Sequence, residues 1–238
     1  MFFSNKKMNI LIRIIFFIIL FISFSINAFP IPNNKKVTYD IIRKNKVIGT
    51  HQIEFIANED TLLVKTDINI KVTVLFVTAY KFSHQSTETW SNGDFIKIDA
   101  HSDFEDEREY FIKGYDKDDY FFASGMDGEL KLDKNILPSN FWNIKVLYEK
   151  EIFDTQKGIV RKITVEDKGN EKITINNQEI ECNKYTLNAS TNPKDKGPFP
   201  EYTLWYSIQK NELMKFKFKN WKDKKIVTIV RNYQEKNK

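Results

Sequence analysis

The sequence predicts a mainly β protein with one large, curved antiparallel sheet, either an open half-barrel or a β-sandwich-like meander. Three observations support this. Almost every segment after Pro32 alternates apolar and polar residues at period two, the pattern of half-buried antiparallel strands. Short turns rich in Asn, Asp and Gly, such as "SNGD", "MDGE" and "EDKGN", separate these segments. Helical periodicity is almost absent.

Residues 1–28 predict a secretory signal peptide. They contain no acid, carry three cations, and include an apolar run of 13 residues at 14–26. That run is too short for a helix that spans a bilayer, which needs about 20 apolar residues. Cleavage after Ala28 would leave 29–238 as one exported β-domain in the periplasm, or a secreted one where no outer membrane exists. Retention of the segment as an N-terminal anchor stays open, and membrane contact is expected only through it.

The charge of the chain argues against a nucleic-acid partner. The formal net charge of +5 falls to +2 without the three cations of the signal, and the remaining cations alternate with acids along the sequence. The single cysteine, Cys182, allows no intrachain disulfide and is expected to be a buried structural residue.

Thirteen strands are expected in order along the chain. The longest, at 61–78, is apolar on one face and polar on the other, so it must curve or break once near residue 72, and its apolar face needs a cover. A helix, a second layer or a ligand could supply that cover. The predicted strands lie near 36–44, 46–56, 61–78, 80–90, 94–104, 108–116, 119–125, 158–166, 171–175, 178–190, 201–208, 212–219 and 225–233.

Two segments interrupt the alternation. Residues 137–153 predict one short helix near 139–149 with Ser139 as its N-cap. A division of the β-domain into two parts near 137–157 stays open as an alternative to a single domain. Residues 190–202 form a Pro-rich loop.

Three stretches together resemble a family: "YDIIRKNKVIGTHQIEF" (39–55), "YKFSHQSTETWSNGDF" (80–95) and "LWYSIQKNELMKFKF" (204–218). They resemble an uncharacterised family of exported Gram-negative proteins, a domain of unknown function. Its layout is similar to that of a larger family thought to share the open half-barrel of periplasmic lipoprotein carriers. The resemblance implies fold and compartment but no activity. Related chains favour an acid after "WY", where this chain has Ser207, so no role is carried over to that position.

The candidate site residues lie on two predicted strands. Odd positions 47–55 share one face, which places His51 inward, and Gly49 there predicts a bulge or a close backbone approach. Even positions 80–90 place Tyr80, Phe82, His84, Glu88 and Trp90 on one face of the next hairpin.

If both faces line one concavity, His51, His84 and Glu88 could bind a metal or perform acid/base chemistry. A buried structural network, with His84 paired to Glu88, and a polar anchor for a ligand head group remain as alternatives. No local metal-ligand spacing is present, and no metal or cofactor is predicted. The alternating acids of "DAHSDFEDERE" (99–109) are expected to form a solvated outer face.

The leading functional prediction is a non-enzymatic exported protein that binds a lipid, another hydrophobic ligand or a partner segment on the concave face of its sheet. Aromatic residues, 14% of the chain, would line such a site. One alternative is a structural or interaction protein of the cell envelope with a solid core and an envelope-protein partner. The other is a metal-dependent or acid/base enzyme using His51, His84 and Glu88. The candidate ligand-binding residues are His51, His84, Glu88, Trp90, Tyr80, Phe82 and Trp205.

Overall fold

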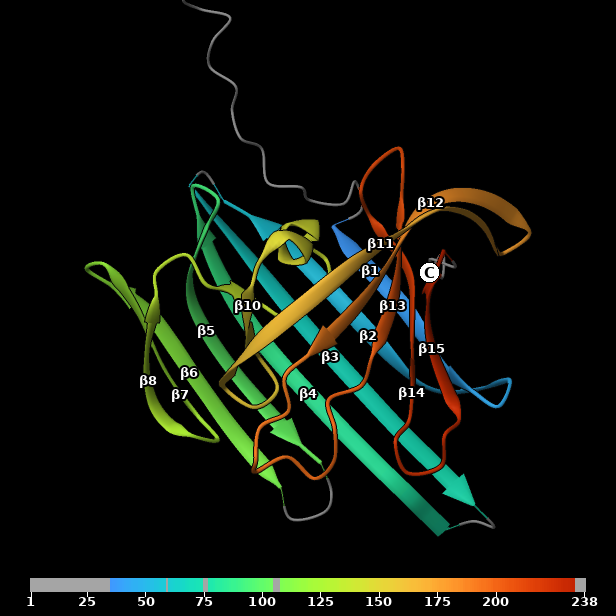
Figure 1. Ribbon diagram of the computed structural model, residues 1–238, viewed down its shortest axis with the longest axis horizontal. Helices are drawn as coiled ribbons and strands as arrows, with labels where there is room; N and C mark the ends of the chain where they lie inside the picture. The colour runs from blue at the N-terminus through green and yellow to red at the C-terminus, as the bar shows by residue number, and fades with distance from the viewer. Residues whose placement is uncertain (1–34, 59, 75–76, 105–107, 234–238) are drawn as a thin grey trace, which may run out of the picture.

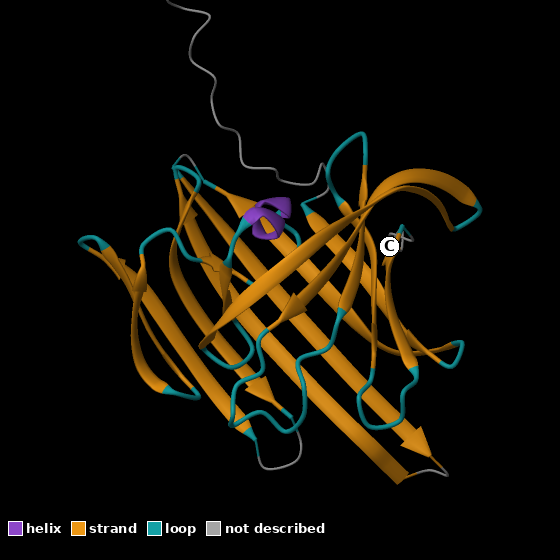
Figure 2. Cartoon of the chain, in the orientation of Figure 1, coloured by secondary structure: helices purple, strands orange, loops and turns teal. Residues whose placement is uncertain are grey.

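The computed structural model describes residues 35–58, 60–74, 77–104 and 108–233, so the predicted signal peptide lies outside the described residues. Within these described residues, fifteen strands form one sheet (Figures 1 and 2). They are β1 (Lys36–Arg43), β2 (Lys46–Ala57), β3 (Thr61–Val74), β4 (Val77–Ser91), β5 (Asp94–Asp103), β6 (Glu109–Lys117), β7 (Tyr120–Gly125), β8 (Gly128–Asp133), β9 (Leu137–Pro138), β10 (Glu151–Asp154), β11 (Ile159–Ile175), β12 (Gln178–Ala189), β13 (Tyr202–Ser207), β14 (Leu213–Lys219) and β15 (Ile226–Asn232).

The sheet is a meander in which the first and last strands of the chain, β1 and β15, pair with each other in the middle of the strand order. Its order is β8-β7-β6-β5-β4-β3-β2-β1-β15-β14-β13-β12-β11-β10-β9, and β1 pairs with β15 antiparallel. The sheet curves so strongly that β11–β14 cross in front of β1–β4, which gives two layers with the core between them (Figure 1). The predicted large, curved antiparallel sheet is therefore confirmed.

The two ends of the sheet approach each other at a pair of glycines. A Cβ added to Gly125 would lie 2.5 Å from the Cα of Gly158, and the Met126 amide donates to the Lys157 carbonyl at 2.7 Å. The absence of side chains at both glycines therefore allows β7 and the β10–β11 turn to come into backbone contact. This contact nearly closes the sheet into a barrel.

Several element boundaries differ from the sequence predictions. β8, β9 and β10 were not predicted, and the segments 158–166 and 171–175 are one 17-residue strand, β11, with a bulge between Asp167 and Asn170. The strand predicted at 61–78 ends at Val74, and a register shift at Val72/Thr73 confirms an irregularity near residue 72.

The one helix of the described residues is a five-residue 3-10 helix, Ile144–Tyr148. Asn143 is its N-cap and accepts from the Lys145 amide at 3.1 Å, so the prediction of Ser139 as N-cap was wrong. The Ser139 hydroxyl accepts instead from the Thr155 amide at 3.3 Å, which joins this segment to the end of β10. No helix in the described part of the chain has the length and apolar character needed to cross a membrane.

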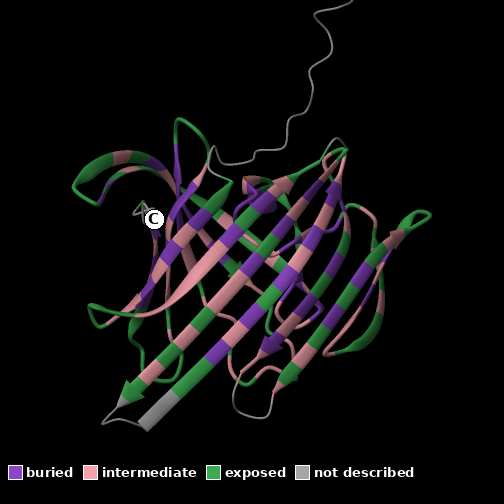
Figure 3. Ribbon diagram, turned by 180° about the vertical axis from the view of Figure 1, so that it is seen from behind, coloured by how far each residue is buried: buried purple, intermediate pink, exposed green. Residues whose placement is uncertain are grey.

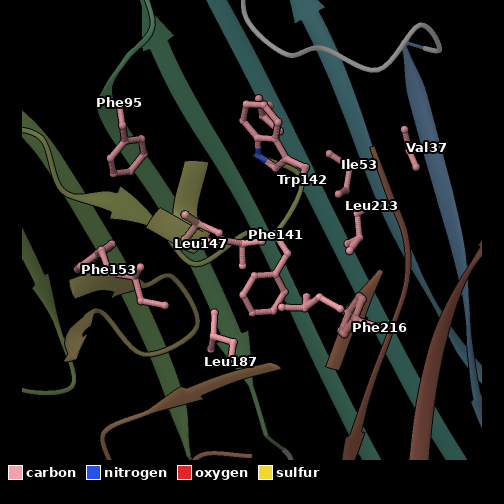
Figure 4. Packing of buried hydrophobic residues seen from close by; sticks show 14 of the residues in the cluster. Val37, Ile53, Phe95, Phe141, Trp142, Leu147, Phe153, Leu187, Leu213 and Phe216 are labelled. Atoms are coloured by element: carbon pink, nitrogen blue, oxygen red, sulfur yellow. The ribbon is translucent and has the colours of Figure 1, made fainter. Parts of the chain in front are cut away.

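The core lies between the two layers, and residues 139–149, here called the plug segment, fill much of it. Phe141, Trp142, Val146 and Leu147 of the plug are buried in the core. Figure 4 shows Phe141, Trp142 and Leu147 between the two layers. The Trp142 ring contacts the Trp90 ring edge-on at a centroid distance of 5.3 Å. This geometry stabilises the core beyond the contribution of the buried apolar area. The cover that the apolar face requires is thus partly a second layer and partly the plug.

Candidate functional site

The inner face of the sheet carries a row of paired residues that contains both predicted histidines. Tyr39 on β1 pairs with His51 on β2, His51 pairs with Ile68 on β3, and Ile68 pairs with His84 on β4, which pairs with Ser102 on β5. Residues directly opposite each other in antiparallel strands project from the same face. His51 and His84 therefore lie on the same face of the sheet, which the sequence left open.

The imidazole of His51 is enclosed by aromatic rings. Its centroid lies 5.5 Å from that of Tyr39 and 6.4 Å from that of Phe216, which meets it edge-on from β14. Burial disfavours the charged form and lowers the pKa of His51 to about 4. The ring is therefore neutral near pH 7.

His84 is more deeply buried, with 2% of its surface exposed, and its Nδ1 lies 2.8 Å from the Ser102 hydroxyl. Burial, and secondarily the proximity of His51 and His101, lowers the pKa of His84 to about 3. His84 is thus hydrogen-bonded to Ser102, and the predicted pairing of His84 with Glu88 was wrong. The sequence places Ser102 at an inward position of β5 but offers no local signal for this contact.

Glu88 forms a separate polar contact with the plug segment. Its side chain is fully buried and accepts from Trp90 Nε1 at 3.1 Å and from Asn140 Nδ2 at 2.5 and 2.6 Å. Burial raises the pKa of Glu88 to about 7, although the hydrogen bonds from Asn140 and Trp90 oppose this shift. The Oδ1 atom of Asn140 is buried and has no hydrogen-bond partner among the described residues.

The three polar candidates share a face but do not converge. His51 and His84 are two strand spacings apart, about 9.6 Å, and Glu88 lies four residues along β4 from His84, about 13 Å. In the described ranges, no three His, Cys, Asp or Glu side chains gather closely enough to hold a metal ion. The geometry consists of separate contacts along one face, His84 with Ser102 and Glu88 with Asn140 and Trp90.

The aromatic candidates fall into two places. Phe82 and Trp90 lie on the inner face with Glu88, where Phe82 contacts Phe104 at a centroid distance of 4.8 Å. Tyr80 extends the same alternation but is 41% exposed. Trp205 lies on the opposite face of its strand, in a small second cluster under the outer part of the β11–β12 hairpin. It therefore does not join the other candidates on the inner face.

The cover of the inner face ends part of the way along β3. Leu62 and Val64 are fully buried, whereas Ile68, Ile70 and Val72 on the same face are only half-buried. Figure 3 shows buried residues concentrated along the half of these strands away from the β3–β4 turn. We call the half-buried stretch, Ile68, Ile70, Val72 and the neighbouring Tyr80, the open half of the inner face.

A shallow depression of about 540 Å³ lies on the other, outer face of β2–β5. Its side chains are polar, and the Gln85 amide donates to Asp67 at 3.1 Å within it. Since apolar ligands require apolar linings, this depression offers no site for an acyl chain. The depression is lined mainly by Gln52, Glu54, Lys65, Asp67, Gln85 and Asp99.

Sequence reasoning missed a buried ion cluster at the base of the Pro-rich loop. Arg161 on β11 is 1% exposed and donates to Asp154 at 2.7 Å and to Asp195 at 2.9 and 3.2 Å. Lys157 also pairs with Asp195. Burial raises the pKa of Asp195, but the hydrogen bonds from Arg161 and Lys157 outweigh it and hold the pKa at about 2. The cluster joins the Pro-rich loop to β10 and β11, and no local pattern signals it because Asp195 lies 34 residues from Arg161 in the sequence.

Comparison with known proteins supports the family and the fold. A search of curated proteins found no match. Among solved structures, this chain is similar to the "Beta-barrel-like Protein of Domain of Unknown Function DUF1849 from Brucella abortus". The two share 10% sequence identity and superpose with a TM-score of 0.59 over 83% of this chain and 94% of that chain. At this identity the likeness shows a common barrel-like fold.

The family prediction is also confirmed at the level of an uncharacterised family. The profile of the "Domain of unknown function (DUF6134)" matches residues 39–231, from the first strand through the last. The matched region contains the His51–His84 row, Glu88, the plug segment and the buried ion cluster. The chain belongs to the family described as Domain of unknown function (DUF6134).

Proposed function

We propose that this protein binds an apolar ligand, such as a lipid acyl chain, on the open half of its inner face. The observation that carries the proposal is the change in exposure along β3, from fully buried Val64 to half-buried Ile70, on a face that is apolar apart from Thr66. Apolar side chains that continue past their cover leave surface that a hydrocarbon chain would bury favourably.

The residues around the open half suit such a ligand. Ile70 pairs with Phe82 on β4 and with Gly49 on β2, so a hydrocarbon chain would meet an aliphatic, an aromatic and a flat backbone surface side by side. The missing side chain of Gly49 lets β2 approach β3 closely here, since an added Cβ would lie 2.1 Å from the Asn69 carbonyl oxygen. His51, two residues further along β2, would be a polar group on the same face for a ligand head.

The proposal includes export and a non-enzymatic role. Export is supported by the basic and then apolar character of residues 1–28, and it would place the binding face in the periplasm, where free lipids need a carrier. A non-enzymatic role is supported by the separation of His51, His84 and Glu88, because acid/base or metal chemistry requires such groups within contact of one substrate.

A structural or interaction protein of the cell envelope is the second candidate. The plug segment favours it, because Phe141, Trp142, Val146 and Leu147 already fill the other half of the inner face with side chains. In that case the open half would be covered by a partner protein.

Binding of a fluorescent fatty acid, 11-(dansylamino)undecanoic acid, tests the proposal on protein purified from its own host. Ile70→Glu places a charge on the open half and is expected to weaken saturable binding by about tenfold or more, corresponding to about 1.4 kcal/mol. Lys71→Glu, the next residue on the outer face, is the matched control and is expected to bind as wild type. Melting temperatures of both variants show whether each is folded.

Native mass spectrometry of the host-purified protein supplies a second readout, in which a co-purifying lipid is expected. Absence of saturable probe binding to the wild type, or equal weakening by both variants, would overturn the proposal. A stable complex with an envelope protein and no bound lipid would favour the second candidate.

A further inference from the structure

Two turns that are far apart in sequence form one basic surface. The β1–β2 turn at Lys44–Asn45 and the β14–β15 turn at 220–225 lie side by side, because β1 and β15 pair with Arg43 opposite Val227. An ion pair between Arg43 and Asp223 joins the two turns directly. Figure 1 shows these turns at the same end of the sheet.

The surface is dense in positive charge. We call it the basic rim; it comprises Arg43, Lys44, Lys46, Lys219, Lys222, Lys224 and Lys225. Asp223 is the single acid in residues 43–46 and 219–225. Seven cations and one acid give these two segments a net charge of 7 − 1 = +6, which exceeds the net charge of +5 of the entire chain. Along the sequence the cations alternate with acids, but strand pairing brings these two short basic segments together in space.

Large apolar side chains project among these cations. Val47 is 59% exposed, Ile226 is 47% exposed and Trp221 is 42% exposed. The Trp221 indole packs on Gly197, where an added Cβ would lie 2.5 Å from the ring, so the ring is held in place on the Pro-rich loop. An indole fixed at the surface among lysines is typical of proteins that contact the lipid head-group region.

The basic rim also lies beside the open half of the inner face. β2 leaves the β1–β2 turn and pairs with the last residues of β3, with Gly49 opposite Ile70, so the turn and the open half are at one end of the sheet. A flat anionic surface that contacts the rim would therefore meet the end of the apolar face as well.

We propose that the basic rim docks this protein onto a bilayer that contains anionic phospholipids. Lysine and arginine side chains near such a surface are attracted by its negative potential, and Trp221, Val47 and Ile226 would enter the interfacial region. Docking would bring the open half of the inner face to the lipid surface for exchange of its ligand. This last consequence rests on the proposed function, whereas the docking itself does not.

Co-sedimentation with vesicles tests the docking, using protein purified from its own host. Vesicles of phosphatidylcholine with one quarter phosphatidylglycerol are expected to bind the wild type at 50 mM salt, and vesicles of phosphatidylcholine alone are not. Binding is expected to weaken at 500 mM salt because salt screens charges at the surface. The variant K222E/K224E/K225E is expected to lose about 100-fold in partitioning onto the anionic vesicles.

The control is K97E/K113E/K117E, which makes the same change in net charge at exposed positions of β5 and β6, away from the rim. It is expected to bind within about twofold of wild type. Equal binding of the wild type to both vesicle types, or equal losses in the two triple variants, would overturn the proposal. The fatty-acid probe separates the two ideas, since the rim variant should keep wild-type probe affinity. Vesicle binding without probe binding would leave the docking standing and reject the ligand proposal.

Discussion

The amide of Asn140 lies against the carboxyl group of Glu88, with Nδ2 2.6 Å from Oε1 and 2.5 Å from Oε2. This contact joins the plug segment to β4 at a fully buried position. The Oδ1 atom of Asn140 has no partner among the described residues. Burial at this position favours the neutral form of the Glu88 carboxyl group.

Glu88→Gln is expected to remove a pH dependence of stability. The pKa of Glu88 is about 7 in the folded protein, against an ordinary value of 4.5, so the folded protein holds a proton that the unfolded chain releases. The resulting stabilisation is complete below about pH 4.5 and is lost as the pH rises through 7, a change of about 3 kcal/mol. Glutamine mimics the neutral acid and should keep that stability at pH 8.

Urea unfolding at pH 5.5 and pH 8 measures this effect. The Glu88→Gln variant should be more stable than wild type at pH 8, and the difference should shrink at pH 5.5. Glu54→Gln, at an exposed position of β2, is the matched control. Parallel pH dependence in wild type and Glu88→Gln would contradict the assignment of the buried proton to Glu88.

The imidazoles of His51 and His84 are expected to stay neutral in mildly acidic solution. Their folded pKa values are about 4 and about 3, both below the ordinary 6.5, because burial disfavours the charged ring. The unfolded chain thus binds more protons below pH 6.5, so the stability contributed by the neutral rings is lost as the pH falls from 6.5 through 4. NMR measures the protonation of the two rings. The histidine signals are followed from pH 8 to pH 4.5 and are assigned with the variants His51→Gln and His84→Gln. Midpoints near 6.5 for these two rings would show that water reaches the row.

Arg161→Leu is expected to destabilise the fold by about 3–5 kcal/mol, because it leaves Asp154 and Asp195 buried without their shared cation. Lys162→Leu, the adjacent exposed residue of β11, is the control and should change stability by less than about 0.5 kcal/mol. Chemical unfolding measures the change in the free energy of unfolding for each variant. Trypsin should cleave the Pro-rich loop at Lys194 or Lys196 faster in Arg161→Leu, since the cluster attaches that loop to the sheet. Equal stability of the two variants would mean that the cluster contributes little.

The alternation of apolar and polar residues was sufficient to predict most strands and the face of each candidate residue. Position in a strand fixes the face, so His51, His84 and Glu88 were correctly placed inward. It does not fix the distance between strands, which depends on the pairing order and register. The two histidines are therefore separated by β3, a relationship that no local pattern contains.

The elements that the sequence missed lack alternation or depend on distant contacts. β10 has three consecutive buried residues, Ile152–Asp154, so it reads as neither a half-buried strand nor a helix. The contact of Asn140 with Glu88 spans 52 residues, and the basic rim combines turns about 175 residues apart. Charge patterning along the sequence misses such clusters because it counts neighbours in the chain, whereas strand pairing sets neighbours in space.

Gly49 lies where the backbones of β2 and β3 approach each other closely. The register of β1 and β2 shifts here, since Ile41 pairs with Gly49 but Ile42 pairs with Val47, which turns Val47 away from the inner face. A Cβ at position 49 would lie 2.1 Å from the Asn69 carbonyl oxygen and 2.9 Å from the Ile70 Cα. The predicted bulge and close backbone approach are both confirmed.

Gly49→Ala is therefore expected to destabilise the protein by about 2–4 kcal/mol, because relief of the clash requires β2 and β3 to separate where they pair. Thr50→Ala, the next residue, should cost less than about 1 kcal/mol, since it removes a partly exposed side chain and introduces no clash. Urea unfolding of the two variants measures the difference. If Gly49→Ala were as stable as Thr50→Ala, the strands would have to relax at this position, and the open half of the inner face would then widen where the ligand is proposed to bind.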